Sequence, residues 1–289
     1  MAEYRTIALS DPQFERDCLR LLTFKSPALK GRGDVSLFVP PGCESGQKLP
    51  LVVLLHGVYA SHWAWSLMGG AHMTALDLIN HGLIGPMVIA MPSDGLWGDG
   101  TGYVPHASAD YEKWIMDDVV GCVTEVIPCL GAHSELFLAG LSVGGYGALR
   151  LGAKCARRVS GISAHSSLTH LDQLALFVEE PIAAYKTSAE DLSVLHWVKK
   201  NKDILPPTRF DCGTSDVLLE DNRQLHCELA ALGIQHQYVE FEGGHEWPYW
   251  REHLKDSLIF FERERGNQSE KIAHINQPGQ SMKKDLTTL

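Results

Sequence analysis

The feature that most constrains the fold is the segment 136–149, which reads Leu-Phe-Leu-Ala-Gly-Leu-Ser-Val-Gly-Gly-Tyr-Gly-Ala-Leu. A short apolar run leads into Gly-Leu-Ser-Val-Gly and then into small residues with a helical pattern, which predicts a strand, a tight turn and a helix. The turn strains the backbone at Ser142, so the residues two positions before and after it must be small. Gly140 and Gly144 meet this requirement. The segment predicts a nucleophile elbow that presents the Ser142 hydroxyl at a helix N-terminus, where free N–H groups favour negative charge.

A motif of five residues also occurs by chance, and the alternative is a glycine-rich turn with a solvated serine. The prediction therefore depends on partners elsewhere in the chain. The first lies upstream, where the apolar run Leu51–Leu55 is typical of a strand buried on both faces. In acyl-transfer enzymes with a serine elbow, the loop after this early strand donates one N–H to the oxyanion, and the residue after the serine donates another. Here these donors would be the amides of Val58 and Val143. His56, at the base of the loop, is predicted to bond the loop backbone rather than to transfer protons.

The candidate general base is His245. The segment Gln237–Phe241 alternates like a late strand, and a Gly-Gly loop carrying His245 follows it. Glycines allow such a loop to reach over the serine. The competitors are His236, which begins the strand, and His253, which lies inside the following helical stretch. The other histidines show no spacing typical of a metal site, and the chemistry needs no cofactor.

The candidate acid is Asp216. The run Thr208–Cys212 is predicted to be a strand, and Asp216 lies on the turn after it. An acid at this place would hold the imidazole tautomer and stabilise the imidazolium. Asp211, within the strand, and Asp221, early in the next helix, are the alternatives. The resulting order of serine, acid and histidine differs from the orders in chymotrypsin and subtilisin and matches that of the serine-elbow enzymes.

Apolar runs alternate with longer helical patterns along the chain, which predicts a mostly parallel, doubly wound α/β sheet. Residues 110–127 are predicted to form a helix that faces the core. We expect one catalytic domain over residues 1–263 and a polar, mobile tail over 264–289. The predicted strands are Val35–Val39, Leu51–Leu55, Met87–Met91, Leu136–Ala139, Val159–Ile162, Arg209–Cys212 and Tyr238–Phe241.

Composition excludes some classes of protein and of binding partner. The chain has 289 residues and a net charge of −10, which argues against a nucleic-acid surface. No apolar segment has the length of a membrane span, and the N-terminus does not read as a secretory signal, although a chain whose leader has been removed would read the same. Seven scattered cysteines without a Cys-x-x-Cys pair favour reduced thiols and a cytoplasmic location. We expect a small-molecule partner and leave a homo-oligomer open.

Two segments are expected to shape the substrate site. The glycine-rich loop 92–103 carries Trp97 and follows a strand, so it should lie at the edge of the sheet where ligands bind. The segment 166–202, between the serine and the acid, is expected to form a modest lid. The candidate substrate contacts are Trp63, Trp97, Tyr146 and Trp247, and the alternative for such aromatics is a place in the core.

The chain resembles the esterase D family within the α/β-hydrolases, which includes S-formylglutathione hydrolases, tributyrin and acetyl-ester esterases, and some feruloyl esterases. The resemblance implies an α/β-hydrolase fold and serine carboxylesterase activity through an acyl-enzyme, with acyl transfer or thioester hydrolysis by the same residues as the alternative. The matching segments span roughly residues 20–262: Ser26-Pro-Ala-Leu29, Ser36-Leu-Phe-Val-Pro-Pro-Gly42, Leu54-Leu-His-Gly57, Gly140 to Leu149, Gly213-Thr-Ser-Asp216, Asn222-Arg223 and Gly244-His-Glu-Trp247.

At two motifs the chain differs from the S-formylglutathione hydrolases, which makes a glutathione thioester a less favoured substrate. S-formylglutathione hydrolases usually carry Glu-Gly-Leu-Thr-Cys in the oxyanion loop and Ser-Met-Gly-Gly-His at the elbow. This chain has His56-Gly-Val-Tyr-Ala60 and Ser142-Val-Gly-Gly-Tyr146 at these places. The His-Gly form is similar to that of the acetyl-ester and tributyrin esterases. Nothing in the sequence resembles a long apolar cap or tunnel, and the region between the serine and the acid is short, so we expect a preference for short acyl groups, acetyl to butyryl.

Overall fold

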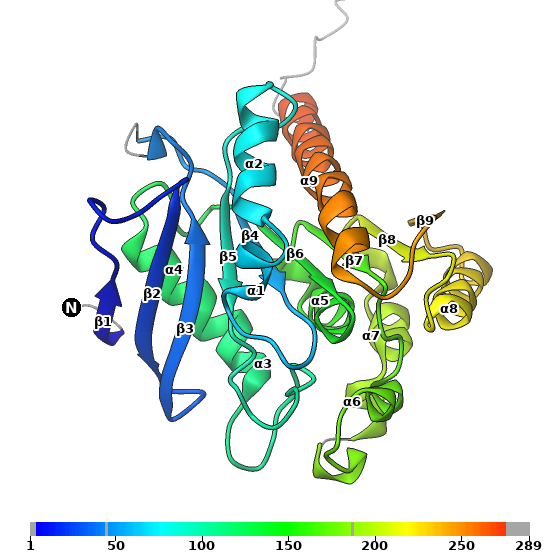
Figure 1. Cartoon of the computed structure of the whole chain (residues 1–289). Coiled ribbons are helices and arrows are strands. Elements are labelled where there is room, and N and C mark those ends of the chain that lie inside the picture. Colours follow the sequence, from blue (N-terminus) through cyan, green and yellow to red (C-terminus); the bar gives the residue numbers. More distant parts are fainter. Residues whose placement is uncertain (1–3, 44–45, 186–187, 276–289) are drawn as a thin grey trace, which may run out of the picture.

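The computed structural model describes residues 4–43, 46–185 and 188–275, and these residues are built around a nine-stranded sheet (Figure 1). The strand order is β1-β2-β3-β5-β4-β6-β7-β8-β9. The pairs from β1 to β5 along this order are antiparallel, and the pairs from β5 to β9 are parallel, which confirms the predicted mostly parallel sheet. The strands are β1 (Arg5–Leu9), β2 (Leu19–Ser26), β3 (Gly31–Phe38), β4 (Leu51–Leu55), β5 (Val88–Pro92), β6 (Leu136–Leu141), β7 (Gly161–His165), β8 (Thr208–Gly213) and β9 (Gln237–Phe241).

Helices cover both faces of the sheet. On one face lie α2 (Ala71–Asn80) and α9 (Trp247–Ile275), and on the other lie α4 (Val120–Val126) and α5 (Val143–Lys154) (Figure 1). The central strand β4 is apolar throughout because its side chains alternate between the two cores, with Val52 and Leu54 on the α2 and α9 side. The remaining helical elements are α1 (Ala64–Leu67), α3 (Tyr111–Lys113), η2 (Trp114–Val119), η3 (Ala156–Arg158), η4 (Leu171–Leu176), η5 (Ile182–Ala184), α6 (Ala189–Leu192), α7 (Val194–Lys200), η6 (Lys202–Ile204) and α8 (Leu219–Ala231).

The helix predicted over residues 110–127 is present as α3, η2 and α4 in succession, with one π-helical stretch in its middle. Its N-terminus is capped by Asp110, whose side chain accepts a hydrogen bond from the Lys113 N–H. The aromatic residue Trp114 is fully buried in the core of the α4 and α5 side. The aromatic content of this helix therefore serves packing.

The topology brings distant loops to one edge of the sheet. The chain leaves β4 for β5 on one side and then returns to β6 on the other side of β4, which creates a switch point beside the ends of these strands. Because β4 to β9 run parallel, the loops after β4, β6, β8 and β9 emerge at the same edge. These are the four loops that carry the residues predicted to act in catalysis.

The helix α9 is longer than the sequence predicted. We expected a polar tail to begin at residue 264, but α9 continues to Ile275. Charged side chains support this extension. The Arg265 guanidinium lies 3.5 Å from the Glu262 carboxylate one turn earlier in α9, and 3.4 Å from the carboxylate of Glu135, which precedes β6. The helix therefore continues through the predicted boundary at 263/264, and the part of the predicted tail after residue 275 lies outside the described residues. No helix in the described ranges is long and apolar enough to cross a membrane.

One cysteine pair contradicts the predicted reduced thiols. Cys43, in the segment between β3 and β4, forms a disulfide with Cys129, which follows α4. The sequence offered no signal for this pair because the two cysteines are separated by 86 positions. Disulfides persist in oxidising compartments, so the cysteine argument for a cytoplasmic location no longer holds.

Reduction of this disulfide is expected to lower the free energy of unfolding by about 2–5 kcal/mol, because the bond closes a long loop in the unfolded chain. Urea unfolding of the oxidised protein, the reduced protein and the Cys43→Ser variant measures this loss. Cys227→Ser is the matched control, since Cys227 is an exposed free cysteine. An unfolding midpoint that is the same for the oxidised protein and for Cys43→Ser would contradict a stabilising role of the bond.

Candidate active site

The elbow after β6 has the strained geometry that its sequence predicts. Ser142 has φ 54° and ψ −122°, and α5 begins at the next residue. A Cβ atom at Gly140 would overlap the Gly144 carbonyl, and one at Gly144 would overlap the Leu55 carbonyl, so both positions exclude larger residues. The Ser142 N–H donates to the His165 carbonyl at 2.9 Å, which ties the elbow to the end of β7. The turn therefore presents the Ser142 side chain at the N-terminus of α5.

A line of hydrogen bonds runs from this serine across three loops. His245 Nε2 lies 3.0 Å from Ser142 Oγ, and His245 Nδ1 lies 3.1 Å from each carboxylate oxygen of Asp216. The Asp216 side chain is fully buried, whereas the His245 side chain is 17% exposed. The structure thus brings Ser142, Asp216 and His245 together, although they are far apart in sequence.

The acid of this line is held in its charged form. Burial by itself would raise the pKa of the Asp216 carboxyl, but the hydrogen bond and charge of His245, together with the Leu218 N–H, hold that pKa below its ordinary value. The Leu218 N–H donates to Asp216 Oδ1 at 2.9 Å. A carboxylate held in this way accepts the Nδ1 proton of His245 and leaves Nε2 free to face the serine.

The loop after β4 lies beside the serine. A Cβ atom at Gly57 would lie 3.5 Å from Ser142 Cβ and 2.8 Å from Leu141 Cδ1, so this backbone approaches the elbow closely. The N–H of Tyr59 donates to the Asp99 carbonyl at 2.8 Å and fixes the far end of the loop. Among the described residues, the N–H groups of Val58 and Val143 have no hydrogen-bond acceptor. Val58 directly follows Gly57 and Val143 directly follows Ser142, so both predicted oxyanion donors lie on backbone beside the serine.

His56 has the structural role that we predicted. Its Nδ1 donates to the Gly57 carbonyl at 2.6 Å, and its Nε2 accepts the Asp94 N–H at 3.1 Å. Burial lowers the pKa of His56, so the ring stays neutral. Its two ring nitrogens are therefore used to join the loop after β4 to the loop after β5.

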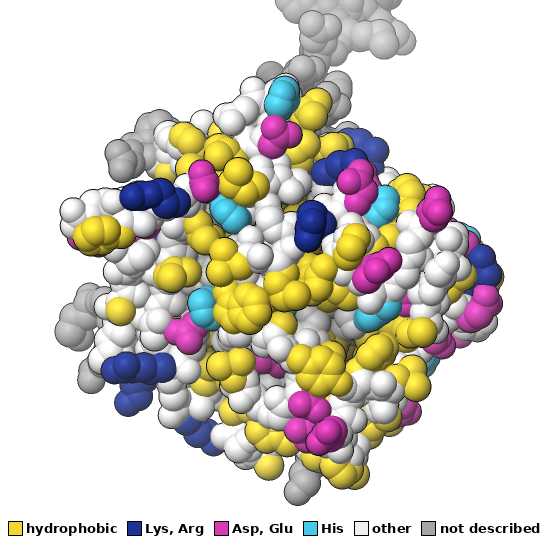
Figure 2. Space-filling model, viewed as in Figure 1, with side chains coloured by type: hydrophobic (Ala, Val, Ile, Leu, Met, Phe, Trp, Pro, Cys, Tyr) yellow, Lys and Arg dark blue, Asp and Glu magenta, His cyan; other side chains and the backbone are white. Residues whose placement is uncertain are grey.

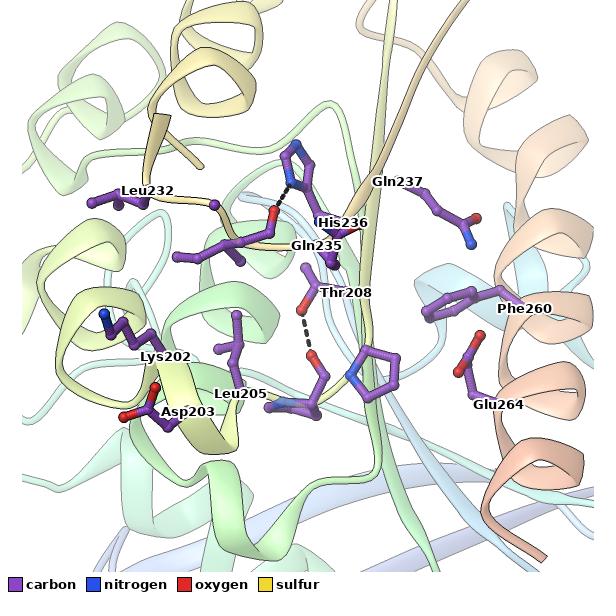
Figure 3. A pocket seen from close by; sticks show the side chains of 14 residues that line it. Lys202, Asp203, Leu205, Thr208, Leu232, Gln235, His236, Gln237, Phe260 and Glu264 are labelled. Carbon is purple, nitrogen blue, oxygen red and sulfur yellow. Dashed lines mark hydrogen bonds between the residues drawn. The ribbon is translucent and has the colours of Figure 1, made fainter. Parts of the chain in front are cut away.

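The histidine competitors lie away from the serine. His236 begins the segment leading into β9, and its Nδ1 donates to the Ile234 carbonyl at 2.8 Å. His236 lines a cavity of about 700 Å³ together with Thr208 and Phe260, and Figure 3 shows these side chains. Thr208 and His236 lie where β8 and β9 begin, whereas Asp216 and His245 follow the other ends of these strands. His253 lies on α9 and pairs with Asp256 at 3.0 Å.

The two competing acids, Asp211 and Asp221, form no hydrogen bond with His245 in the described structure. Asp211 is fully buried and pairs with His165, and Asp221 lies in the first turn of α8. Only Asp216, of the three acids considered, hydrogen-bonds His245 in the described structure.

The four predicted substrate contacts differ in their exposure and in what they pack against. The Tyr146 side chain is fully buried, and its hydroxyl donates to the Leu192 carbonyl at 2.6 Å. Trp97 packs its ring edge-on against His106 and Tyr185, so it holds the loop after β5 in place. Trp63 is 41% exposed, and the half-buried Trp247 packs against Trp65 and Trp250.

One aromatic residue was missed by the sequence analysis. Phe177 follows η4 in the segment between β7 and β8, and its ring stacks on His245 with ring centroids 5.2 Å apart and planes 20° from parallel. The irregular segment around it has no periodicity, so no local signal marked this residue.

The predicted lid segment, residues 166–202, is bonded to the loop after β5. The Glu179 N–H donates to Asp99 Oδ2 at 2.9 Å, and the Tyr185 hydroxyl donates to the Gly100 carbonyl at 2.7 Å.

Hydrophobic side chains form a band across the middle of the face shown in Figure 2. Exposed large apolar residues are also frequent on the segments that border the serine, and such residues often mark binding surfaces. In the part of the chain that the structure describes, no three His, Cys, Asp or Glu side chains gather as metal ligands. The exposed apolar residues on the bordering segments are Tyr59, Trp63, Leu67, Met68, Leu96, Leu176 and Val217.

Comparisons with known proteins identify esterases as relatives of this chain. The family model described as "Putative esterase" matches residues 26–261. An acetyl esterase of Caldicellulosiruptor saccharolyticus is 26% identical over 231 residues, which cover 73% of this chain and 83% of that protein. The family model and the acetyl esterase relative confirm the predicted resemblance to an esterase family.

Two solved structures show the same fold. A ferulic acid esterase has a TM-score of 0.75 at 24% identity, covering 85% of this chain and 98% of its own. An S-formylglutathione hydrolase from Staphylococcus aureus has a TM-score of 0.72 at 16% identity, covering 88% of this chain and 99% of its own. Since the family model spans most of the chain, the protein belongs to this esterase family and is a serine carboxylic ester hydrolase with the α/β-hydrolase fold.

Proposed function

We propose that the protein hydrolyses short-chain acyl esters through an acyl-enzyme formed on Ser142. The observation that carries this proposal is the unbroken hydrogen-bond line from Ser142 Oγ through His245 to Asp216, which begins at a strained elbow. Nucleophile, base and orienting acid are the three groups that acyl transfer to a serine needs.

Each residue has a defined step in this mechanism. Ser142 Oγ attacks the ester carbonyl while His245 Nε2 takes its proton, and the Val58 and Val143 N–H groups hold the oxyanion. His245 then gives the proton to the departing alcohol, which leaves an acyl group on Ser142. In the second half, His245 takes a proton from water, the hydroxide attacks the acyl carbonyl, and the acid is released as Ser142 regains its proton. Asp216 stays ionised throughout and stabilises the imidazolium of His245.

The shape of the lid segment supports a small acyl group. The elements between β7 and β8 are short, and Phe177 from this segment already lies on the His245 ring. We propose that Phe177, Trp63 and Trp247 contact the substrate in place of Tyr146 and Trp97. The acetyl esterase relative acts on an acetyl ester by its name, which agrees with a small acyl group. The net charge of −10 supports a small ester rather than a nucleic acid as the partner.

The expected specificity profile rises briefly with acyl length and then falls. Each added methylene that the site buries stabilises the transition state by up to about 0.8 kcal/mol, so kcat/KM should increase from acetate to butyrate. It should decrease for longer chains that no longer fit. Measuring kcat/KM for p-nitrophenyl esters from acetate to palmitate tests this. A maximum at dodecanoyl or longer would overturn the preference for short chains.

The same assay separates hydrolysis from its alternatives. With an alcohol added at increasing concentration, a hydrolase continues to release free acid as the main product. An acyltransferase would instead give the new ester as the main product. S-lactoyl or S-formyl thioesters, compared with oxygen esters of the same acyl group, test thioester hydrolysis, for which we expect the lower kcat/KM.

A further inference from the structure

A second Ser–His–Asp arrangement lies buried behind the proposed triad. His165 Nε2 lies 2.7 Å from Ser257 Oγ, and His165 Nδ1 lies 3.0 Å from Asp211 Oδ1. All three side chains have no solvent exposure. Because substrate has no access to it, this arrangement is not a second catalytic centre, and a different role must explain three buried polar groups.

These groups belong to a network of six buried side chains, which we call the Asp211 network: Ser163, His165, Arg209, Asp211, Tyr249 and Ser257. β7 and β8 pair in parallel, with Ser163 beside Arg209 and His165 beside Asp211, so the four strand residues form two neighbouring pairs on one face of the sheet. Tyr249 and Ser257 reach this face from α9. The network therefore joins two strands and a helix through polar contacts where an apolar core would be usual.

The polar contacts of the Asp211 network form a closed ring of hydrogen bonds and one ion pair, in which Arg209 contacts Ser163 on one side and Asp211 on the other. Arg209 donates to Ser163 Oγ at 3.1 Å, and Ser163 and Ser257 share a hydrogen bond of 2.6 Å. Ser257 Oγ and His165 Nε2 share a hydrogen bond, and His165 Nδ1 donates to Asp211 Oδ1. The ring closes where Arg209 Nη2 lies 2.8 Å from Asp211 Oδ2. Polar contacts are strong in a low-dielectric interior, so a closed ring of them holds its members in one geometry.

Asp211 and Arg209 form a buried ion pair within the ring. Burial would raise the pKa of the Asp211 carboxyl, but His165, Arg209 and the Tyr249 hydroxyl hold that pKa below its ordinary value. Asp211 is therefore a buried carboxylate next to a buried guanidinium. Breaking one member of such a set leaves the others poorly satisfied, so the network resists displacement of any of its elements.

One end of the network holds the nucleophile. The main-chain carbonyl of His165 accepts the Ser142 N–H at 2.9 Å, and the carbonyl of Asp211 accepts the N–H of Ser166, which follows His165, at 2.8 Å. The backbone at Ser142 is thus bonded directly to a residue whose side chain lies in the ring.

The other end supports the loop of the base. The Tyr249 hydroxyl donates to Asp211 Oδ1 at 2.9 Å, while its ring packs under Gly243, where an added Cβ would lie 2.7 Å from Tyr249 Cδ2. Gly243 has φ 137° and begins the turn that carries His245. The carbonyl of Gly243 also accepts the N–H of Ser215, next to Asp216, at 2.8 Å. Through Tyr249 the network therefore contacts the loop of His245, which is itself bonded to the loop of Asp216.

We propose that the Asp211 network is a positioning unit, which fixes the His245 loop relative to the Ser142 elbow so that Nε2 stays within hydrogen-bond distance of Oγ. This inference rests on the proposed roles of Ser142 and His245. Small displacements of a base from its nucleophile cost large factors in rate, which gives such a unit a measurable effect on turnover.

The test compares two buried tyrosine hydroxyls. Tyr249→Phe keeps the ring under Gly243 and removes only the hydroxyl that reaches Asp211. Tyr4→Phe is the matched control, because Tyr4 is also buried and its hydroxyl donates to the Asp117 carbonyl at 3.1 Å in another part of the molecule. We expect Tyr249→Phe to lower kcat by roughly 10-fold to 100-fold with KM within about twofold, and Tyr4→Phe to leave both unchanged.

A double-mutant cycle with His245→Ala separates positioning from general weakening of the fold. If Tyr249 acts through His245, Tyr249→Phe has no further effect on the residual turnover once His245 is absent. A merely structural role would lower the melting temperature of Tyr249→Phe and leave kcat at 25 °C as in the original protein, which overturns the proposal. An equal fractional loss of kcat in both backgrounds also overturns it.

The outcomes distinguish this inference from the proposed function. Full activity of Ser142→Ala or His245→Ala would refute the catalytic roles themselves. Inactive Ser142→Ala and His245→Ala variants together with an unchanged Tyr249→Phe variant would refute only the positioning unit. Asp211→Asn provides a second arm with the same expected loss of kcat, and if that variant does not fold, the comparison of the two tyrosines still decides.

Discussion

Replacing Ser142 by alanine is expected to lower kcat by about 10⁴–10⁶-fold while the fold is retained. The change removes one hydroxyl from a residue with no other side-chain hydrogen bond than the one to His245 in the described structure. Steady-state hydrolysis of p-nitrophenyl acetate, followed over long times and corrected for the uncatalysed rate, measures the loss. Circular dichroism shows whether the fold is intact.

Ser26→Ala is the matched control for this variant. The Ser26 hydroxyl is buried and donates to Asp118, away from the loops that carry the triad, so its loss should affect stability and leave kcat unchanged. Labelling with a fluorophosphonate gives an independent readout, since the adduct should be found on Ser142 by mass spectrometry. Ser257, which faces a histidine and an aspartate in the same order but without solvent access, should stay unlabelled. A stable adduct on another serine with loss of activity would show that the nucleophile is misassigned.

Loss of the base is expected to be as severe as loss of the nucleophile. His245→Ala should lower kcat by about 10⁴–10⁶-fold, because the serine and the histidine act as one unit. Asp216→Asn should cost about 10⁴-fold, since the amide no longer holds the Nδ1 proton and the imidazole takes the wrong tautomer. Both values come from kcat at saturating substrate, with KM measured alongside to show that binding persists.

The competing histidines provide the controls here. His236→Ala and His253→Ala change residues of the same type whose side chains bond Ile234 and Asp256 rather than Ser142. Both variants should keep kcat within about twofold. If either one abolished turnover while His245→Ala did not, the assignment of the base to the loop after β9 would have to be given up.

Local sequence determined the elbow and the chemical types around it. The strained turn at Ser142 needs small residues at fixed positions within five residues, so the requirement is written in the spacing itself. The loops after β4, β8 and β9 follow the same logic, because an apolar strand of known direction delivers the next loop to the same edge of a parallel sheet. His245 and Asp216 could therefore be named in advance as partners that the fold brings to Ser142.

Contacts between distant segments were decided only by the tertiary structure. The Cys43–Cys129 pair, the stacking of Phe177 on His245 and the Asp211 network all join residues from different elements. Each of these contacts depends on strand order, register and the path of irregular segments, which local periodicity does not specify. Asp211 illustrates this best.

In the sequence Asp211 and Asp216 were both candidate acids on or after one strand. The sheet turns Asp211 inward to a buried histidine, whereas the loop after β8 carries Asp216 to His245. Tyr146 is a second side chain whose direction the sequence did not specify, since one turn into α5 its hydroxyl points to the Leu192 carbonyl.

The sequence by itself determined which chemical groups the site contains, because those requirements are local. The tertiary structure decided which acids and aromatics reach it, because side-chain direction depends on packing between elements far apart in the chain.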